Sequence, residues 1–450
     1  MAAPLRRIAL LTATFILTLI PRVWGIDRHF ALLEDQIRDW GIALGSFTSL
    51  PLVGPPTHFR GYTIGPAPYW ILWSIRVVIG PWFQNLPHGG GIGQAMLASA
   101  ADTLLLAAVW KRTGSVWLAL TAVVILATAP FDLSLAAVIW TPVVASTLVK
   151  TATALILLDW PRPSLARTGV TAAIAWSAVQ TYTGTVFAAL GIFAALLVED
   201  AVRRDWRAAL RRGLVVAGVI GALQVPYLIH QAAHRFREPA MSAVTGSISG
   251  IIRGKEPLRL AASGARYVKA VDIIAVSPWH LSAAGWILLA CAVLLAVRYR
   301  PDPALLSVTL LPQLAAILGY ALWLGDLQEY YYLSLMPAAV LTVLLGATAL
   351  VPARSAHLAG IALLVGAVAI VPARLRYAAT LPRLPAYGIL LDASRQIIRL
   401  KQPMRSIHPQ FALPASTDPE FMFRILGGRI DQRAEWRAEI SPDGRVTYRR

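Results

Sequence analysis

A cluster of charged residues interrupts an apolar region near the N-terminus. The stretch LLEDQIRDW, residues 32–40, places three carboxylates around the guanidinium of Arg38. If the stretch is helical, Glu34 and Asp35 lie four and three residues before Arg38, and Asp35 shares a face with Asp39. This spacing raises the pKa of one acid and lowers that of another, or it belongs to a solvated helix with ordinary ion pairs. The spacing alone does not separate these alternatives.

The composition indicates a membrane protein with many spans. Of 450 residues, 57% are hydrophobic and 14% are charged, and the mean hydropathy is +0.60, outside the usual range of soluble domains. The net charge of +18 does not indicate nucleic acid as a partner, because the basic residues lie largely in short clusters between apolar runs. The single cysteine, Cys291, permits no intrachain disulfide.

Repeated apolar runs predict helices that cross a bilayer, which requires about 20 residues each. Placing the N-terminus in the cytoplasm puts successive basic clusters, such as Lys111-Arg112 and Arg203-Arg204, on the inner side. No small-residue cleavage site follows the first run, so we interpret it as an uncleaved span. The predicted spans, about eleven in all, are residues 7–24, 92–110, 116–134, 142–159, 166–181, 183–198, 213–231, 281–298, 304–324, 334–351 and 356–372.

Three hydrophilic segments are then expected outside the cell, at residues 25–91, 232–280 and 373–450. In the first, the tryptophan-rich stretch 67–83 predicts an interfacial helix on the outer face. The third predicts a small α+β domain with a hairpin at Pro442-Asp443-Gly444. The sequence therefore predicts an all-α polytopic protein of the cytoplasmic membrane, whose transmembrane domain covers residues 1–372 and whose C-terminal domain is extracytoplasmic.

The order of five short segments points to a family. They are DQIRDW (35–40), GPAPYW (65–70), AVIWTPVVAS (137–146), VQTYTG (179–184) and QEYYYLSLMPA (328–338). Together they resemble the motifs of GT-C membrane glycosyltransferases, in the glycosyltransferase family 39-like branch of protein O-mannosyltransferases and lipid A aminoarabinose transferases. The chain departs from the family at several positions: Ile64 replaces a frequent histidine, Ala67 and Pro68 replace the common Leu-Tyr, Thr141 replaces an asparagine, and Glu329 replaces a basic residue.

The resemblance implies a function. We expect transfer of a monosaccharide from a polyprenyl-phosphate donor to a lipid, glycan or protein acceptor at the outer face of the membrane. Asp35 falls on the family's catalytic acid position and is expected to act as the general base of an inverting displacement. Glu34 is the second candidate for this role, or a partner that orients the substrate.

Cationic and aromatic side chains are candidates for donor binding. Guanidinium groups bind phosphate oxygens in a bidentate manner, although each arginine here also has an ordinary role in a helix pair, a loop or the membrane interface. Tyr69 suits stacking on a sugar ring or a place in an aromatic belt. The predicted substrate-binding residues are Arg38, His58, Arg60, Tyr69, Arg76 and Glu329.

A transporter or flippase of lipid-linked sugars is the alternative function. Asp102 lies inside the second predicted span, and intramembrane acids are functional candidates. Against this alternative, the sequence shows no matched pair of broken helices in two related halves. The histidines are scattered without a zinc-binding motif. The resemblance to the monosaccharide-transferring branch, together with the scarcity of external acids, implies a site without a divalent metal, so we expect neither a metal ion nor another cofactor.

Overall fold

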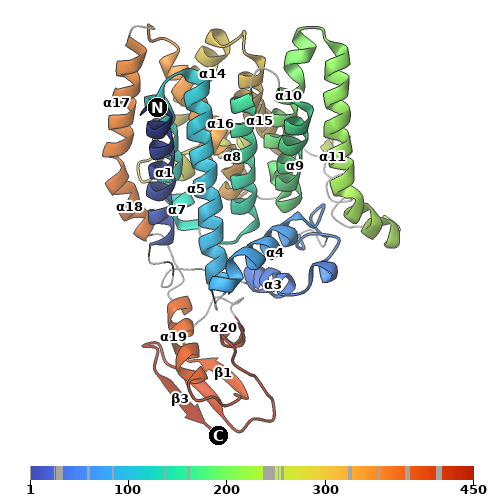
Figure 1. The fold of residues 1–450 in the computed structure, drawn as a ribbon, viewed down its shortest axis with the longest axis vertical. Coiled ribbons are helices and arrows are strands. Elements are labelled where there is room, and N and C mark those ends of the chain that lie inside the picture. The colour runs from blue at the N-terminus through green and yellow to red at the C-terminus, as the bar shows by residue number, and fades with distance from the viewer. Residues whose placement is uncertain are drawn as a thin grey trace.

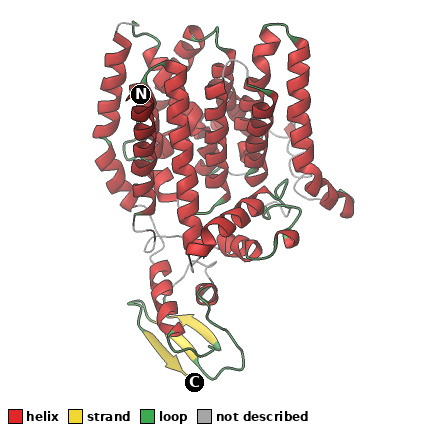
Figure 2. Cartoon of the chain, in the orientation of Figure 1, coloured by secondary structure: helices red, strands yellow, loops and turns green. Residues whose placement is uncertain are grey.

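The computed structural model shows a bundle of helices with a small α/β domain at one end (Figures 1 and 2). The N-terminus lies at the other end of the bundle (Figure 1). The structure describes residues 2–24, 26, 34–57, 61–83, 86–135, 138–159, 163–236, 249–251, 253–254, 258–322, 327–352, 355–380, 386–411 and 418–450.

Within these residues, all but one of the predicted spans coincide with a helix of the bundle. Seven helical segments of the described chain are long and apolar enough to cross a membrane, which makes the chain a multi-pass membrane protein. The bundle helices are α1 (Ala2–Val23), α5 (Leu86–Thr113), α6 (Val116–Ala127), α8 (Thr141–Asp159), α9 (Leu165–Thr181), α10 (Val186–Val202), α11 (Trp206–Ala233), α14 (Ala284–Arg298), α15 (Pro303–Ala321), α16 (Met336–Thr348) and α17 (Ala356–Ala369).

One predicted span is divided in the structure. The sequence predicts a single helix over 116–134, but α6 ends at Ala127 and a separate short helix, α7 (Pro130–Leu135), follows. Proline disfavours a helical conformation at the residue before it, and here Pro130 begins the new helix. The break allows α7 to change direction, so that Asp132 reaches the interior of the bundle.

Small residues let the bundle helices approach closely, as is usual in membranes. A Cβ atom at Gly346 of α16 would lie 2.2 Å from the carbonyl oxygen of Cys291 in α14. At the end near the N-terminus, ion pairs join neighbouring helices. Asp200 of α10 contacts Arg212 of α11 at 2.8 Å, and Asp302 contacts Arg112 of α5.

Two helices of the first hydrophilic segment lie across the opposite end of the bundle (Figure 1). They are α3 (Glu34–Ala43) and α4 (Ala67–Ile79), which confirms helices at both predicted places. Arg76 of α4 donates to the carbonyl oxygens of Ala43 and Gly45, at 3.0 and 2.6 Å. These carbonyls have no partner within α3, so Arg76 fixes the end of this helix.

The C-terminal domain contains a sheet of order β1-β2-β3. Strands β1 and β2 are parallel, and β2 and β3 form the predicted hairpin, with Gly444 at φ +81° in the turn. Leu390, Ile407 and Phe423 are buried in its core. The last elements are α18 (Val371–Thr380), α19 (Ala386–Ile398), β1 (Ser406–Pro409), α20 (Pro419–Ile425), β2 (Arg437–Ile440) and β3 (Val446–Arg449).

Candidate functional site

Helix α3 presents two carboxylates to one guanidinium, as its spacing predicts. Arg38 donates from Nη1 to Oδ1 of Asp35 and from Nε to Oδ1 of Asp39, both at 2.9 Å. The Tyr69 hydroxyl of α4 donates to the same Asp39 oxygen at 3.4 Å. Glu34 begins α3, and its side chain lies outside the described part of the structure.

The two carboxylates of this cluster have different environments. The side chain of Asp35 is 59% exposed, whereas that of Asp39 is 7% exposed. Burial raises the pKa of Asp39 to about 6, although the hydrogen bond and charge of Arg38 oppose the rise. The carboxyl with the shifted pKa is therefore that of Asp39, which was not among the predicted site residues. The one feature of the sequence that pointed to Asp39 was its spacing of four residues from Asp35.

The opposite face of α3 is anchored in an apolar cluster. Trp40 is completely buried there, and a Cβ atom at Gly90 of α5 would lie 2.1 Å from its ring. The same cluster includes Leu391 of α19 and Phe421 of α20. The C-terminal domain therefore packs against the helix that carries Asp35 and Asp39.

Aromatic residues from three of the five motif segments meet near Asp35. Tyr330 belongs to the 3₁₀ helix η5 (Glu329–Leu335), and the Asp35 carboxylate makes only a small electrostatic contribution at its hydroxyl, after burial and Tyr331. Its ring centroid lies 4.7 Å from that of Trp140 and 6.4 Å from that of Tyr182. Three segments far apart in the sequence thus meet in one aromatic cluster, and the Tyr330 hydroxyl of this cluster is within electrostatic range of Asp35.

A second charged cluster lies at the start of η5. Glu329 contacts Lys269 at 3.2 Å and Arg266 at 3.4 Å. Both cations come from α13 (Leu260–Val271), within the second predicted external segment. Glu329 directly precedes Tyr330, so the two cations lie at the start of the same element that carries the Tyr330 ring.

The overall fold is similar to that of ArnT from Cupriavidus metallidurans, solved bound to undecaprenyl phosphate. The two structures have a TM-score of 0.53 and 15% sequence identity, over 97% of this chain and 93% of that one. The chain has the GT-C fold. This result agrees with the resemblance of the motifs.

Structures of an archaeal GT-C enzyme give weaker matches. The oligosaccharyltransferase of Archaeoglobus fulgidus tethered with an acceptor peptide has a TM-score of 0.47 and 14% identity, over 94% of this chain and 63% of that one. The structure of this enzyme, AglB, in complex with an inhibitory peptide and a dolichol-phosphate has a TM-score of 0.43 and 14% identity, over 88% of this chain and 58% of that one. No protein-family model matches the sequence, and no curated protein matches it.

Within the GT-C fold, the remaining predicted site residues have different positions. His58 and Arg60 lie outside the described residues. Tyr69 is 2% exposed and supports Asp39 in this structure, while Arg76 contacts the carbonyls that follow α3. Among the described residues, no group of three or more histidine, cysteine, aspartate or glutamate side chains is placed to hold a metal ion.

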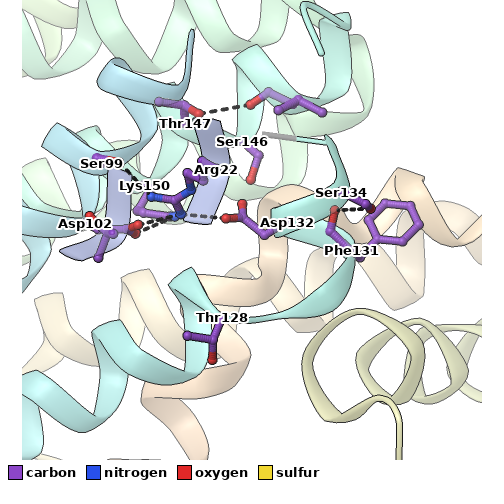
Figure 3. Close-up of polar contacts among 12 residues, drawn as sticks. Arg22, Ser99, Asp102, Thr128, Phe131, Asp132, Ser134, Ser146, Thr147 and Lys150 are labelled. Carbon is purple, nitrogen blue, oxygen red and sulfur yellow. Dashed lines mark hydrogen bonds and ion pairs between the residues drawn. The ribbon is translucent and has the colours of Figure 1, made fainter. Parts of the chain in front are cut away.

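The intramembrane acid Asp102 belongs to a buried ion-pair network (Figure 3). Its carboxylate contacts Lys150 of α8 at 2.6 Å and Arg22 of α1 at 2.7 Å. Arg22 also contacts Asp132 of α7 at 2.5 Å and donates to the Ser99 hydroxyl at 3.0 Å. Two cations and two anions thus balance within the GT-C bundle, and the network ties together α1, α5, α7 and α8.

Proposed function

We propose that the protein is a glycosyltransferase that moves one sugar from a polyprenyl-phosphate donor to a lipid, glycan or protein acceptor. The observation that carries this proposal is the position of Asp35. In a chain with the GT-C fold, this exposed carboxylate is carried by α3, which lies across the end of the bundle where the C-terminal domain also lies (Figure 1); it contacts Arg38 and is within electrostatic range of Tyr330. With a cytoplasmic N-terminus, transfer takes place at the outer face of the cytoplasmic membrane.

In the proposed reaction, Asp35 is the general base. Its carboxylate takes the proton of the acceptor hydroxyl while the acceptor oxygen forms a bond to the anomeric carbon of the sugar. The bond between that carbon and the phosphate oxygen breaks, and the polyprenyl phosphate leaves with the electron pair. The acceptor attacks from the face opposite the phosphate, so the anomeric configuration is inverted.

Cations near Asp35 stabilise the leaving phosphate. Negative charge grows on the phosphate as the bond breaks, and guanidinium and ammonium groups placed in advance lower the energy of this step. Arg266 and Lys269 are partly exposed and share only one described carboxylate, Glu329, so they are the strongest candidates. Arg38, which binds Asp35, is another candidate for contact with the phosphate, and Arg60 is a further candidate.

The aromatic rings give the sugar a binding surface. Tyr330 and Trp140 are both partly exposed, and their ring centroids are 4.7 Å apart. Aromatic faces provide a large apolar contact area, which suits the C–H face of a sugar ring. We propose that these two residues orient the donor sugar toward Asp35.

The buried network removes the main support for a transporter or flippase. Asp102 suggested that alternative because an acid within a span is a functional candidate. In the structure, two cations engage this carboxylate, and a structural role accounts for it.

A reconstituted system distinguishes transfer from translocation. Liposomes that contain the purified protein receive polyprenyl-phosphate monosaccharides labelled in the sugar, with envelope lipids, glycans and proteins as acceptors. We expect release of polyprenyl phosphate and movement of the label to an acceptor. Label that crosses the bilayer while still attached to its lipid, without bond cleavage, would show a flippase instead.

The same assay tests whether the reaction is independent of metal ions. Because we assign phosphate stabilisation to arginine and lysine side chains, excess EDTA is expected to leave the transfer rate unchanged. A rate that falls with EDTA and returns with Mg²⁺ or Mn²⁺ would contradict this assignment while leaving the transferase proposal intact.

A further inference from the structure

Arg38 is held at two points, and only one of them is the proposed base. Its Nη1 atom binds Asp35 and its Nε atom binds Asp39, so the guanidinium plane lies between the two carboxylates. Asp35 is exposed and has no other described hydrogen-bond donor among the contacts of α3 and α4. Its orientation therefore depends on where Arg38 is fixed.

We propose that Asp39 is a positioning residue: it fixes the Arg38 guanidinium, which in turn holds Asp35 toward the acceptor. This inference rests on the proposed function, since it assigns a role relative to the base of that reaction. Arginine suits the role because its planar fork binds two partners in a defined geometry. Without Asp39, the half-buried Arg38 side chain has more rotamers available and holds Asp35 less firmly.

Asp39 is itself fixed from two sides. The hydroxyl of Tyr69 donates to the same oxygen that accepts from Arg38. The next residue, Trp40, is anchored in the apolar cluster that the C-terminal domain completes with Phe421 and Met422. Asp39 is therefore the buried carboxylate with two side-chain donors, and Asp35 is the exposed carboxylate that accepts from Arg38.

The buried position of Asp39 gives the site a dependence on pH. Arg38 and Asp35 on α3 and Tyr69 on α4 are the groups of the described chain whose charges or hydrogen bonds act on Asp39. Its pKa is raised to about 6, so Asp39 becomes neutral as the pH falls through this value. The neutral carboxyl binds Arg38 more weakly, and the hold on Asp35 loosens.

The same shift predicts how Asp39 affects stability. A carboxyl whose pKa is higher in the folded than in the unfolded protein favours the folded state at low pH, and this contribution is lost as the pH rises through about 6. At neutral pH the charged form of Asp39 therefore opposes folding. A neutral residue of the same shape avoids this cost, and Arg38 keeps Asp35 as a partner.

Asp39→Asn, in the full-length protein reconstituted in lipid, tests the inference. We expect kcat for sugar transfer to fall about 10- to 100-fold, the usual cost of misplacing a reacting group by about 1 Å, with a smaller change in KM for the donor. The melting temperature at neutral pH is expected to stay the same or to rise. The acidic limb of the wild-type kcat profile, with a pKa near 6, should be absent in the variant.

Tyr69→Phe is the companion variant, because it removes one hydrogen bond to ionised Asp39. Loss of this bond raises the pKa of Asp39 further, so the acidic limb should move to higher pH. The inference would be overturned if Asp39→Asn kept full activity and an unchanged acidic limb. It would also be overturned if the variant lost activity only because its melting temperature was lower than that of the wild type. An inactive wild-type protein would instead overturn the proposed function.

Discussion

Asp35→Asn is expected to lower the rate of sugar transfer by about 10²- to 10⁴-fold, the usual contribution of a positioned general base. The amide has nearly the shape of the carboxylate but cannot accept the proton of the acceptor hydroxyl. Asp35 is 59% exposed, so its replacement should leave the fold intact, with an unchanged melting temperature. The measurement is single-turnover transfer from a labelled donor in lipid.

Asp392→Asn is the matched control for this variant. Asp392 lies in α19 and contacts Arg395, three residues later, at 3.4 Å, and its side chain is 70% exposed. It thus has the same helical spacing, a similar exposure and the same kind of arginine partner as Asp35, but it lies on a helix of the C-terminal domain. Transfer by the control should equal that of the wild type. If Asp35→Asn transferred sugar as fast as the control, Asp35 would not be the base.

Asp102→Asn is expected to reduce stability by about 3–5 kcal/mol, the usual cost of removing one partner from a buried ion pair. The carboxylate of Asp102 is completely buried between Lys150 and Arg22. Its removal leaves two cations with Asp132 as the one described anion of the network. The free energy of unfolding can be measured by SDS titration, with the midpoint of thermal unfolding as a second measure.

Two further variants test whether the loss of stability comes from the unbalanced buried charge or from the loss of any carboxylate. Asp431→Asn removes a carboxylate from a surface pair with Arg429, at 3.6 Å, and should cost at most about 1 kcal/mol. In Asp102→Asn/Lys150→Met, one cation is removed together with the anion, so the double variant should be more stable than the charge-unbalanced single variant. If Asp102→Asn were as stable as the surface variant, the network would not be structural, and Asp102 would return as a candidate transport residue.

The features that the sequence predicted well depend on local rules. The shared face of Asp35 and Arg38 follows from helical spacing, and the β2–β3 hairpin follows from the turn residues around Gly444. The division of the span at Pro130 also had a local signal, which the apolar pattern across 116–134 concealed. The motif order predicted the GT-C fold because it extends over most of the chain.

The features that could not be predicted depend on packing between distant segments. Asp102 and Lys150 are 48 positions apart, and no spacing rule relates residues on different helices. Asp39 is buried where α3 lies against α4, whose Tyr69 donates to it, and the neighbouring Trp40 shares an apolar cluster with Phe421 of the C-terminal domain. The sequence therefore located the acid cluster, but only the structure showed which carboxylate is buried.

The most direct test of the proposed reaction follows the donor phosphate by ³¹P NMR. The protein in lipid is mixed with a polyprenyl-phosphate monosaccharide and an acceptor, and the phosphodiester signal is monitored. We predict that wild-type protein and Asp392→Asn convert it to the phosphomonoester of polyprenyl phosphate, one for each sugar transferred, and that Asp35→Asn does not. The account would be contradicted if the wild-type protein left the phosphodiester intact with every donor tested. It would also be contradicted if Asp35→Asn cleaved the phosphodiester at the wild-type rate.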